Sequence, residues 1–205
     1  MQRFFRGKKV LVAGGSGMIG QCAVRKCLDQ GAYVRATQFN STLSIQHPNL
    51  EVITCDLRDR SLTGSVFKNI DIVLLCAGKV RGAKFIVEDP TSFIMYNLDI
   101  ISWLIYQATQ ANVGICGFIS SSYVYPDTGN PNLEHEGFEG DPGLQSNYGN
   151  GWYHRYLETL CKHFHRTTDT RFTVVRPTAL YGPHDNFDLD EGHVIPGSIV
   201  KAVDR

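Results

Sequence analysis

The stretch Lys8–Gly20, KKVLVAGGSGMIG, decides the fold of this chain. Its apolar run at 10–13 is typical of a strand buried on both faces of a parallel sheet. Gly14, Gly17 and Gly20 follow at three-residue spacing, and 18–30 then has the pattern of an amphipathic helix. Such glycines allow positive φ, close approach of a phosphate and tight contact between helix and strand. Their place between strand and helix predicts a turn that binds a dinucleotide pyrophosphate at the helix N-terminus, the alternative being a glycine-rich turn without a ligand.

The composition excludes several classes of partner. The chain has 205 residues, and its 20 basic residues balance its 20 acidic ones. This balance does not favour nucleic acid or an anionic membrane surface. No apolar run reaches the roughly 20 residues that span a bilayer, and the first strand starts too early to leave room for a signal peptide. The six cysteines lack CxxC or zinc-like spacing, and most of them lie in apolar runs expected to be buried. We therefore interpret them as reduced core thiols of a cytoplasmic protein without a metal site.

Strand and helix patterns alternate along the rest of the chain. Further strands are expected at 32–37, 50–54, 70–76, 113–121 and 172–175, and helices at 92–112 after Pro90, at 150–166 and from about Pro196. The alternation predicts a doubly wound parallel sheet, a Rossmann fold with three α/β/α layers. Residues 126–147 form a long Gly-, Pro- and Asn-rich loop at the end of the sheet where such folds bind ligands. We expect 1–176 to be a dinucleotide-binding domain and 177–205 the start of a truncated substrate-binding region.

Four motifs follow the glycine turn in a fixed order. They are CDLRD at 55–59, CAG at 76–78, SSSYVY at 120–125, and RPT with YGP between 176 and 183. In these motifs the chain resembles the extended short-chain dehydrogenase/reductases, a family of nucleotide-sugar epimerases, dehydratases and reductases. The stretch 176–196 is most similar to the GDP-fucose synthase branch. The resemblance covers essentially the whole chain, although the family normally continues for roughly another hundred residues.

The resemblance implies a nicotinamide dinucleotide cofactor, NAD or NADP. The residues expected to bind it are Gly14, Ser16, Gly17, Met18, Ile19, Gly20, Gln38, Asp56, Leu57, Ala77, Gly78, Asn97, Pro177 and Thr178. Gln38 stands where NAD sites usually place an acidic residue for the ribose 2′-OH. Its neutral amide removes a repulsion against a 2′-phosphate and slightly favours NADP, although neither Arg35 nor Lys26 is placed to hold that phosphate.

The chain departs from the family at the catalytic pair. In the family a Tyr-x-x-x-Lys pair on one helix face moves the proton during hydride transfer. Here Asn150 and His154 occupy its places. An amide does not titrate, whereas a histidine with a pKa of about 6.5 could relay a proton. The alternative for His154 is a plain surface histidine, and Tyr148 either substitutes as acid/base or only packs at the helix start.

Three other residues complete the expected catalytic set. Ser121 matches the family's catalytic Ser/Thr, whose hydroxyl would bind a sugar oxygen, or else it ties off the strand end by hydrogen bonding. Tyr123 occupies the place of the acid/base cysteine of GDP-fucose synthases, and His193 that of its histidine partner, unless that histidine is merely solvated. A phenol titrates well above a thiol and is a poor substitute for it in C3/C5 epimerisation.

Two functions of different class follow. The first is a nucleotide-sugar epimerase, dehydratase or reductase that transfers hydride between a sugar carbon and NAD(P). The alternative is a catalytically silent dinucleotide-binding module, a sensor or partner subunit, because the Tyr-x-x-x-Lys pair is replaced. Family members commonly dimerise, so a homodimer through the two long helices is a further hypothesis. The apolar residues that would form the contact, unless they face the sheet, are Trp103, Ile105, Trp152 and Tyr156.

Overall fold

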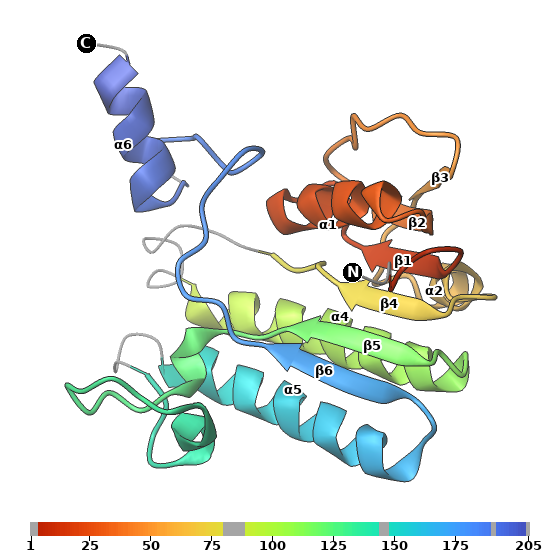
Figure 1. Cartoon of the computed structure of the whole chain (residues 1–205). Helices are drawn as coiled ribbons and strands as arrows, with labels where there is room; N and C mark the ends of the chain where they lie inside the picture. Colours follow the sequence, from red (N-terminus) through yellow and green to blue (C-terminus); the bar gives the residue numbers. More distant parts are fainter. Residues whose placement is uncertain (1–3, 80–88, 144–147, 190–191, 204–205) are drawn as a thin grey trace.

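The computed structural model describes residues 4–79, 89–143, 148–189 and 192–203. Within them, six parallel strands form one sheet in the order β3-β2-β1-β4-β5-β6 (Figure 1). The strands are β1 (Lys9–Ala13), β2 (Tyr33–Gln38), β3 (Leu50–Thr54), β4 (Ile72–Leu75), β5 (Ile115–Ile119) and β6 (Arg171–Val175). The strand order reverses between β1 and β4, and such a reversal opens a crevice at the carboxyl ends of the two strands. The predicted doubly wound parallel sheet is confirmed.

Helices cover both faces of the sheet. They are α1 (Met18–Asp29), α2 (Arg60–Val66), α4 (Pro90–Gln110), α5 (Tyr148–Thr167) and α6 (Val194–Val203), with short 3₁₀ turns η1 (Ser122–Val124) and η2 (Glu134–Phe138). The first helix lies on one face, whereas α4 and α5 run together under the other (Figure 1). The three-layer arrangement is therefore confirmed. Helix α6 stands apart from the sheet in Figure 1, at the end of the segment that follows β6.

The apolar run of β1 supplies both cores. Val10 and Val12 belong to the cluster under α1, whereas Leu11 and Ala13 belong to the cluster under α4 and α5. All four side chains are fully buried. Because successive side chains of a strand point to opposite faces, a central strand covered on both sides must be apolar at every position. This accounts for the continuous run that the sequence shows.

The element boundaries differ from the prediction in a few places. Helix α2 was not predicted; Asp59 caps it by accepting a hydrogen bond from the Ser61 N–H at 2.9 Å. Strand β4 is shorter than the expected 70–76, and α4 begins at Pro90 itself. Gly31 closes α1 with a φ of +84°, as expected for a helix C-terminus. The long loop contains η2, and positions 144–147 of that loop lie outside the described residues.

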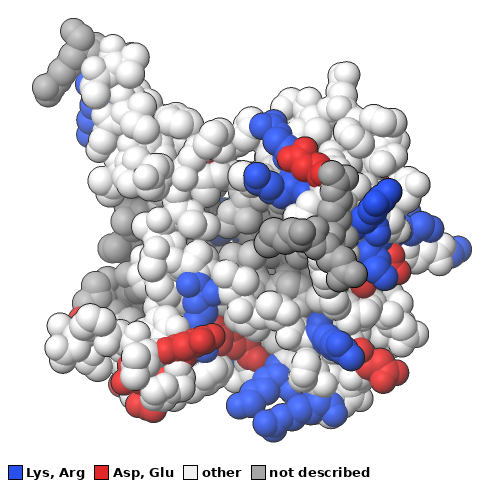
Figure 2. All heavy atoms as spheres, in the orientation of Figure 1, with Lys and Arg blue, Asp and Glu red and all other residues white. Residues whose placement is uncertain are grey.

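The described residues show how charged side chains and cysteines are distributed over the fold. Figure 2 shows basic and acidic side chains in small groups of both signs over one face. All six cysteines are free; four are buried as core thiols and Cys76 is half-buried, whereas Cys22 is exposed and is not a core thiol. No helix among the described residues is long and apolar enough to cross a membrane. In the same residues, His, Cys, Asp and Glu side chains do not gather in threes as metal ligands would.

Candidate functional site

Two glycines of the turn after β1 are required by packing. Gly14 has a φ of +83°, and a Cβ on it would lie 2.6 Å from the Cα of Ala77, which follows β4. A Cβ on Gly20 would strike the carbonyl oxygen of Gly14 and lie 2.8 Å from the Cα of Gly15. Contacts this short do not occur with real side chains. The turn can therefore press against β4 and α1 only because these positions carry no side chain.

Gly17 is different, because nothing in the protein crowds it. A Cβ there would meet only the Gly14 carbonyl oxygen, at an ordinary 3.6 Å, and its φ is −75°. Gly17 is also the N-cap of α1, and no side chain caps that helix end. The first N–H groups of a helix need acceptors, and they attract anions. An open glycine beside an uncapped helix N-terminus fits the pyrophosphate of a dinucleotide.

A cleft of about 200 Å³ opens beside this turn, at the carboxyl ends of β1, β2 and β4. Of the residues expected to bind a cofactor, those that line it are Gly14, Ser16, Gly17, Gln38, Asp56, Leu57, Ala77 and Gly78. Lining residues that were not predicted to do so are Thr37, Phe39, Asn40, Ser41, Cys55, Cys76, Tyr96 and Ile100. Most of these flank the predicted motifs. Tyr96 and Ile100 lie four residues apart on α4, so they face the same side of that helix. This spacing was the only sequence feature that could have predicted that both line the cleft.

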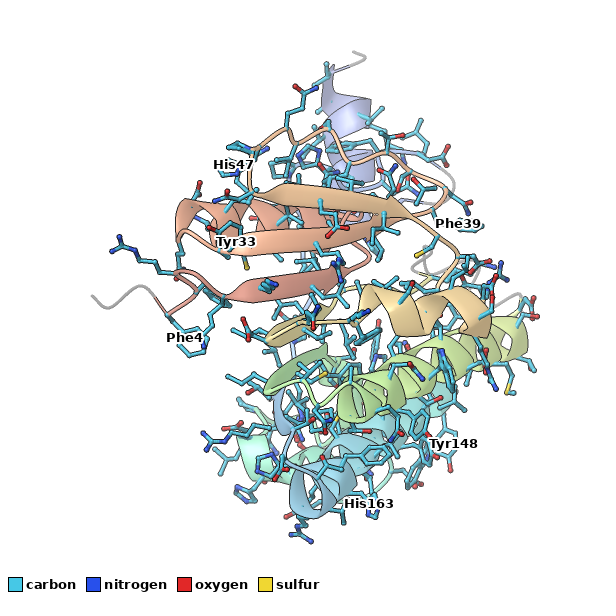
Figure 3. All side chains as sticks on the ribbon, turned by 90° about the vertical axis from the view of Figure 1, so that its right-hand side faces the viewer. Phe4, Tyr33, Phe39, His47, Tyr148 and His163 are labelled. Carbon is cyan, nitrogen blue, oxygen red and sulfur yellow. The ribbon has the colours of Figure 1, made fainter. Side chains whose placement is uncertain are left out.

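The end of β2 forms one end of this cleft. In Figure 3, Phe39 lies just beyond the end of that strand, on the opposite side from Tyr33 at its start. The Gln38 amide is engaged within the fold, because its Nε2 donates to Thr54 Oγ1 at 2.9 Å and its Oε1 accepts from the Leu43 N–H at 2.8 Å. Gln38 therefore lines the cleft while its amide shapes the strand end.

The Asp56 carboxylate holds the segment after β3, and the buried Asn97 amide holds the segment after β4. Hydrogen bonds from Arg58 hold the pKa of Asp56 below its usual range, and the shortest joins Arg58 Nη2 to Asp56 Oδ2 at 2.5 Å. The Asn97 side chain is 2% exposed and binds both backbone groups of Lys79, accepting at 2.8 Å and donating at 3.0 Å. Asn97 is not itself in the cleft lining; it braces the backbone that follows Gly78.

The remaining predicted cofactor residues also lie outside the lining. Met18, Ile19 and Gly20 form the first turn of α1. Pro177 and Thr178 follow β6, and the Pro177 carbonyl accepts from the Ser122 N–H at 3.0 Å. This bond joins the segment after β6 to the turn η1 after β5.

The candidate catalytic residues Ser121 and Tyr123 lie together at the end of β5. Ser121 Oγ accepts from the Tyr123 N–H at 3.2 Å, so this serine does tie off the strand end. The Tyr123 side chain is 38% exposed. Helix α5 packs directly under this turn, since a Cβ on Gly151 would lie 2.5 Å from the Tyr123 carbonyl oxygen.

Asn150 and His154 are both buried on the inner face of α5, and the surface interpretation of His154 is therefore wrong. His154 is 8% exposed, with its ring centroid 4.1 Å from that of Tyr153 and its Nδ1 2.9 Å from the Asn150 carbonyl oxygen. Burial lowers the pKa of His154 to about 4, against the smaller opposing effects of Asn150 and Glu158. At neutral pH the ring is uncharged and cannot replace a lysine ammonium.

Three other polar groups of the candidate catalytic region differ in burial. Asn150 Oδ1 is buried and has no hydrogen-bond partner among the described residues. Tyr148, at the start of α5, is 48% exposed. His193 lies just before α6, its side chain 43% exposed and its Nδ1 3.7 Å from Asp185 Oδ1. Neither these three nor Ser121, Tyr123 and His154 line the cleft beside the glycine turn.

The sheet order, the glycine turn and the cleft at the strand reversal define the class of Rossmann-type dinucleotide-binding folds. The comparison with protein families agrees with this class. The model of the NAD dependent epimerase/dehydratase family matches residues 10–205. The chain belongs to that family.

The individual relatives are named as enzymes of nucleotide-sugar metabolism. A GDP-L-fucose synthase of Dictyostelium discoideum is 31% identical over 95% of this chain and 58% of its own length. A dTDP-4-dehydro-6-deoxy-D-allose reductase of Streptomyces bikiniensis is 31% identical over 96% of this chain and 63% of its own length. The crystal structure of a GDP-L-fucose synthetase from Naegleria fowleri bound to NADP has a TM-score of 0.77 and 25% identity, covering 96% of this chain and 62% of that one. The chain thus spans about three fifths of the relatives it matches.

Proposed function

We propose that this chain carries the dinucleotide-binding part of a nucleotide-sugar oxidoreductase or epimerase that transfers hydride between a sugar carbon and the nicotinamide. The observation that carries the proposal is the open Gly17 at the uncapped N-terminus of α1, beside a cleft at the strand reversal. The sugar-nucleotide class rests on the relatives, which are named as a synthase of GDP-L-fucose and a reductase of a dTDP-linked keto sugar. These names give no support to the alternative of a catalytically silent module.

For the cofactor we propose NADP rather than NAD. The part of the cleft at the end of β2 is lined by the neutral side chains Gln38, Asn40 and Ser41. Without a carboxylate there, a 2′-phosphate meets no repulsion, and amide and hydroxyl groups can donate hydrogen bonds to it. The Naegleria structure bound to NADP supports the same preference.

For the chemistry, we propose that Ser121 binds the sugar oxygen and that a tyrosine supplies the proton. The neutral, buried His154 is an unsuitable donor at pH 7, since its pKa is lowered to about 4. Tyr123 lies in the turn η1, which Ser121 caps, and is partly exposed. A phenol can both donate a hydrogen bond to a carbonyl oxygen and deliver a proton to it.

Titration with NADPH and NADH tests the binding step. We expect nicotinamide fluorescence to change with either nucleotide, and thermal stability to rise with the ligand concentration, more strongly for NADPH. A screen of GDP- and dTDP-linked 4-keto-6-deoxy sugars, followed by NADPH absorbance, then tests turnover. A folded protein that binds neither nucleotide contradicts the proposal at its first step.

The Gly17→Ala variant should separate cofactor binding from folding. The added methyl group fits the protein, so the ligand-free chain should stay folded and lose only the roughly 1 kcal/mol by which alanine is a poorer N-cap than glycine. The methyl group would nevertheless occupy the approach of the pyrophosphate, and we expect NADPH affinity to fall by about tenfold or more. Gly64→Ala is the matched control, because its Cβ also meets nothing closer than 3.5 Å and this exposed residue of α2 does not line the cleft. Equal affinity in both variants would contradict a phosphate site at this turn.

We propose a homodimer through α4 and α5. Tyr148, Trp152 and Tyr156 repeat at every fourth position of α5 and are 48%, 42% and 55% exposed. Ile105 cannot contribute, since it is fully buried in the core under α4 and α5. Sedimentation equilibrium should show twice the 22.9 kDa chain mass, and Trp152→Glu should return the chain mass. A wild-type chain that sediments at 22.9 kDa contradicts the dimer.

A further inference from the structure

Glu158 is a buried carboxylate on α5 and is not one of the expected catalytic residues. Its side chain is 4% exposed. Oε1 accepts from Ser120 Oγ at 2.5 Å, so the helix is joined to the end of β5. Both carboxylate oxygens also face the Arg176 guanidinium, with Nε 2.9 Å from Oε1 and Nη2 2.7 Å from Oε2. The carboxylate thus links the last residue before the turn Ser121–Val124 to the first residue after β6.

Arg176 extends this link to the far side of the turn. Its Nη1 donates to the Tyr125 hydroxyl at 3.1 Å and to the Glu134 carbonyl at 2.6 Å. The guanidinium also lies over the Tyr125 ring, 5.1 Å from its centroid. Gly137 leaves room for the guanidinium, because a Cβ there would strike it. The pKa of Arg176 is raised, chiefly by its hydrogen bonds to Glu158.

A second arginine, Arg155, holds the same turn from three residues before Glu158 on α5. Arg155 is 4% exposed, and its Nε donates to the Val124 carbonyl at 2.8 Å. Its two terminal nitrogens donate to the carbonyls of Gly140 at 2.6 Å and Glu139 at 2.7 Å. The loop after η1 is therefore pinned to α5 by backbone contacts. Among the hydrogen bonds between described residues, a carboxylate partners Arg176 but not Arg155, and that carboxylate is Glu158.

We propose that Glu158 is a positioning residue that sets the place of Ser121 and Tyr123 at the carboxyl end of β5. It fixes Ser120 on one side of the turn directly, and Tyr125 on the other side through Arg176. Its effect on turnover rests on the function proposed above. Its effect on the turn itself does not, because it follows from the hydrogen bonds alone. A misplacement of about 1 Å at a reacting group costs about 100-fold in rate, so such an anchor matters for chemistry.

Glu158→Gln tests the anchor with little change of shape. The amide can still bond Ser120, but it removes the charge that holds Arg176. We expect amide hydrogen exchange at Tyr123, Val124 and Tyr125 to accelerate by about tenfold, while exchange in β1 keeps its wild-type rate. With an active sugar nucleotide, kcat should fall by about 10- to 100-fold, whereas the affinity for NADPH should not change. Glu51→Gln is the matched control. It removes the carboxylate charge from another ion pair, that of Glu51 with Arg35, which lies away from this turn.

The outcomes distinguish the two proposals. Local exchange that accelerates together with a fall in kcat supports the positioning role. Unchanged hydrogen exchange in the turn overturns the positioning role. Faster exchange in both the turn and β1 also overturns it, because Glu158 would then only stabilise the whole fold. Unchanged kcat despite a loosened turn also overturns it. If the wild-type chain turns over no sugar nucleotide while exchange in the turn still accelerates, the proposed function fails and the anchoring of the turn stands.

Discussion

Replacing Gly14 with alanine should lower the free energy of unfolding by about 3 kcal/mol. An alanine at the φ of +83° found here costs about 1–2 kcal/mol by itself. The new Cβ would also lie 2.6 Å from the Ala77 Cα and 2.8 Å from the Cys76 carbonyl carbon, both backbone atoms that cannot rotate away. The turn must then separate from the end of β4, which costs a further amount of about 1–3 kcal/mol. Urea unfolding followed by circular dichroism measures the difference.

Gly7→Ala is the matched control for this loss. Gly7 has a φ of +71°, close to that of Gly14, but a Cβ there would meet nothing within 4 Å. The control should therefore show the cost of backbone strain without the cost of the clash. We also expect Gly14→Ala to lose NADPH binding, because the displaced turn carries the phosphate site. If both variants lose the same stability, the contact between the turn and β4 is not what requires a glycine at position 14.

Local patterns in the sequence predicted the N-terminal half of the fold well. The glycine turn, the apolar β1 and the helix that follows are determined by neighbours within about one turn of chain. The motif residues Asp56, Ala77 and Gly78 meet at the cleft because parallel strands end at one edge of a sheet. Helix α2 was missed since Thr63, Gly64 and Ser65 are weak helix formers. Its one local signal was the capping residue Asp59.

The inner face of α5 could not be predicted in the same way. The helix buries the polar Asn150, His154, Arg155 and Glu158, whereas apolar Trp152 is 42% exposed. A periodicity argument does place the apolar positions 153, 157 and 161 in the core, where they are buried. It assigns polar side chains to solvent, however, and therefore misses that these four polar residues share the buried face. The partners that make polar burial tolerable lie 15 to 38 residues away for the two charged side chains, at Gly140 and Ser120 for example. Contacts of that separation are decided by the fold and leave no local trace in the sequence.

His154 should make the chain sensitive to mild acid. Its pKa is about 6.5 in an unfolded chain and is lowered to about 4 by burial in the fold. Between these two values the unfolded state binds more protons than the folded state, so stability falls as the pH is lowered. The stabilisation is fully present above about pH 6.5 and is lost progressively down to about pH 4. We expect the free energy of unfolding to drop by about 2 kcal/mol between pH 7.5 and pH 5.

His154→Phe should remove this pH dependence. Phenylalanine cannot be protonated, and its ring can keep the stacked contact with Phe118, whose centroid lies 6.5 Å from that of His154. His163→Phe is the control, because His163 is an exposed histidine of the same helix and should leave the wild-type profile unchanged. Urea unfolding at pH 7.5, 6 and 5 supplies the comparison. These pH values lie above the pKa of aspartates in an unfolded chain, so protonation of aspartates contributes little to the difference.

The pH dependence of stability in His154→Phe shows whether position 154 can carry a positive charge in the active site. A profile that flattens in His154→Phe would mean that the fold keeps this ring neutral, so that position 154 offers the active site no positive charge at physiological pH. The family's lysine charge would then have no replacement at position 154, and the proton would have to come from a tyrosine such as Tyr123. A profile that stays as steep in His154→Phe as in the wild type would mean that the ring is solvated in the folded chain. It could then titrate near pH 6.5 and act as the proton relay itself.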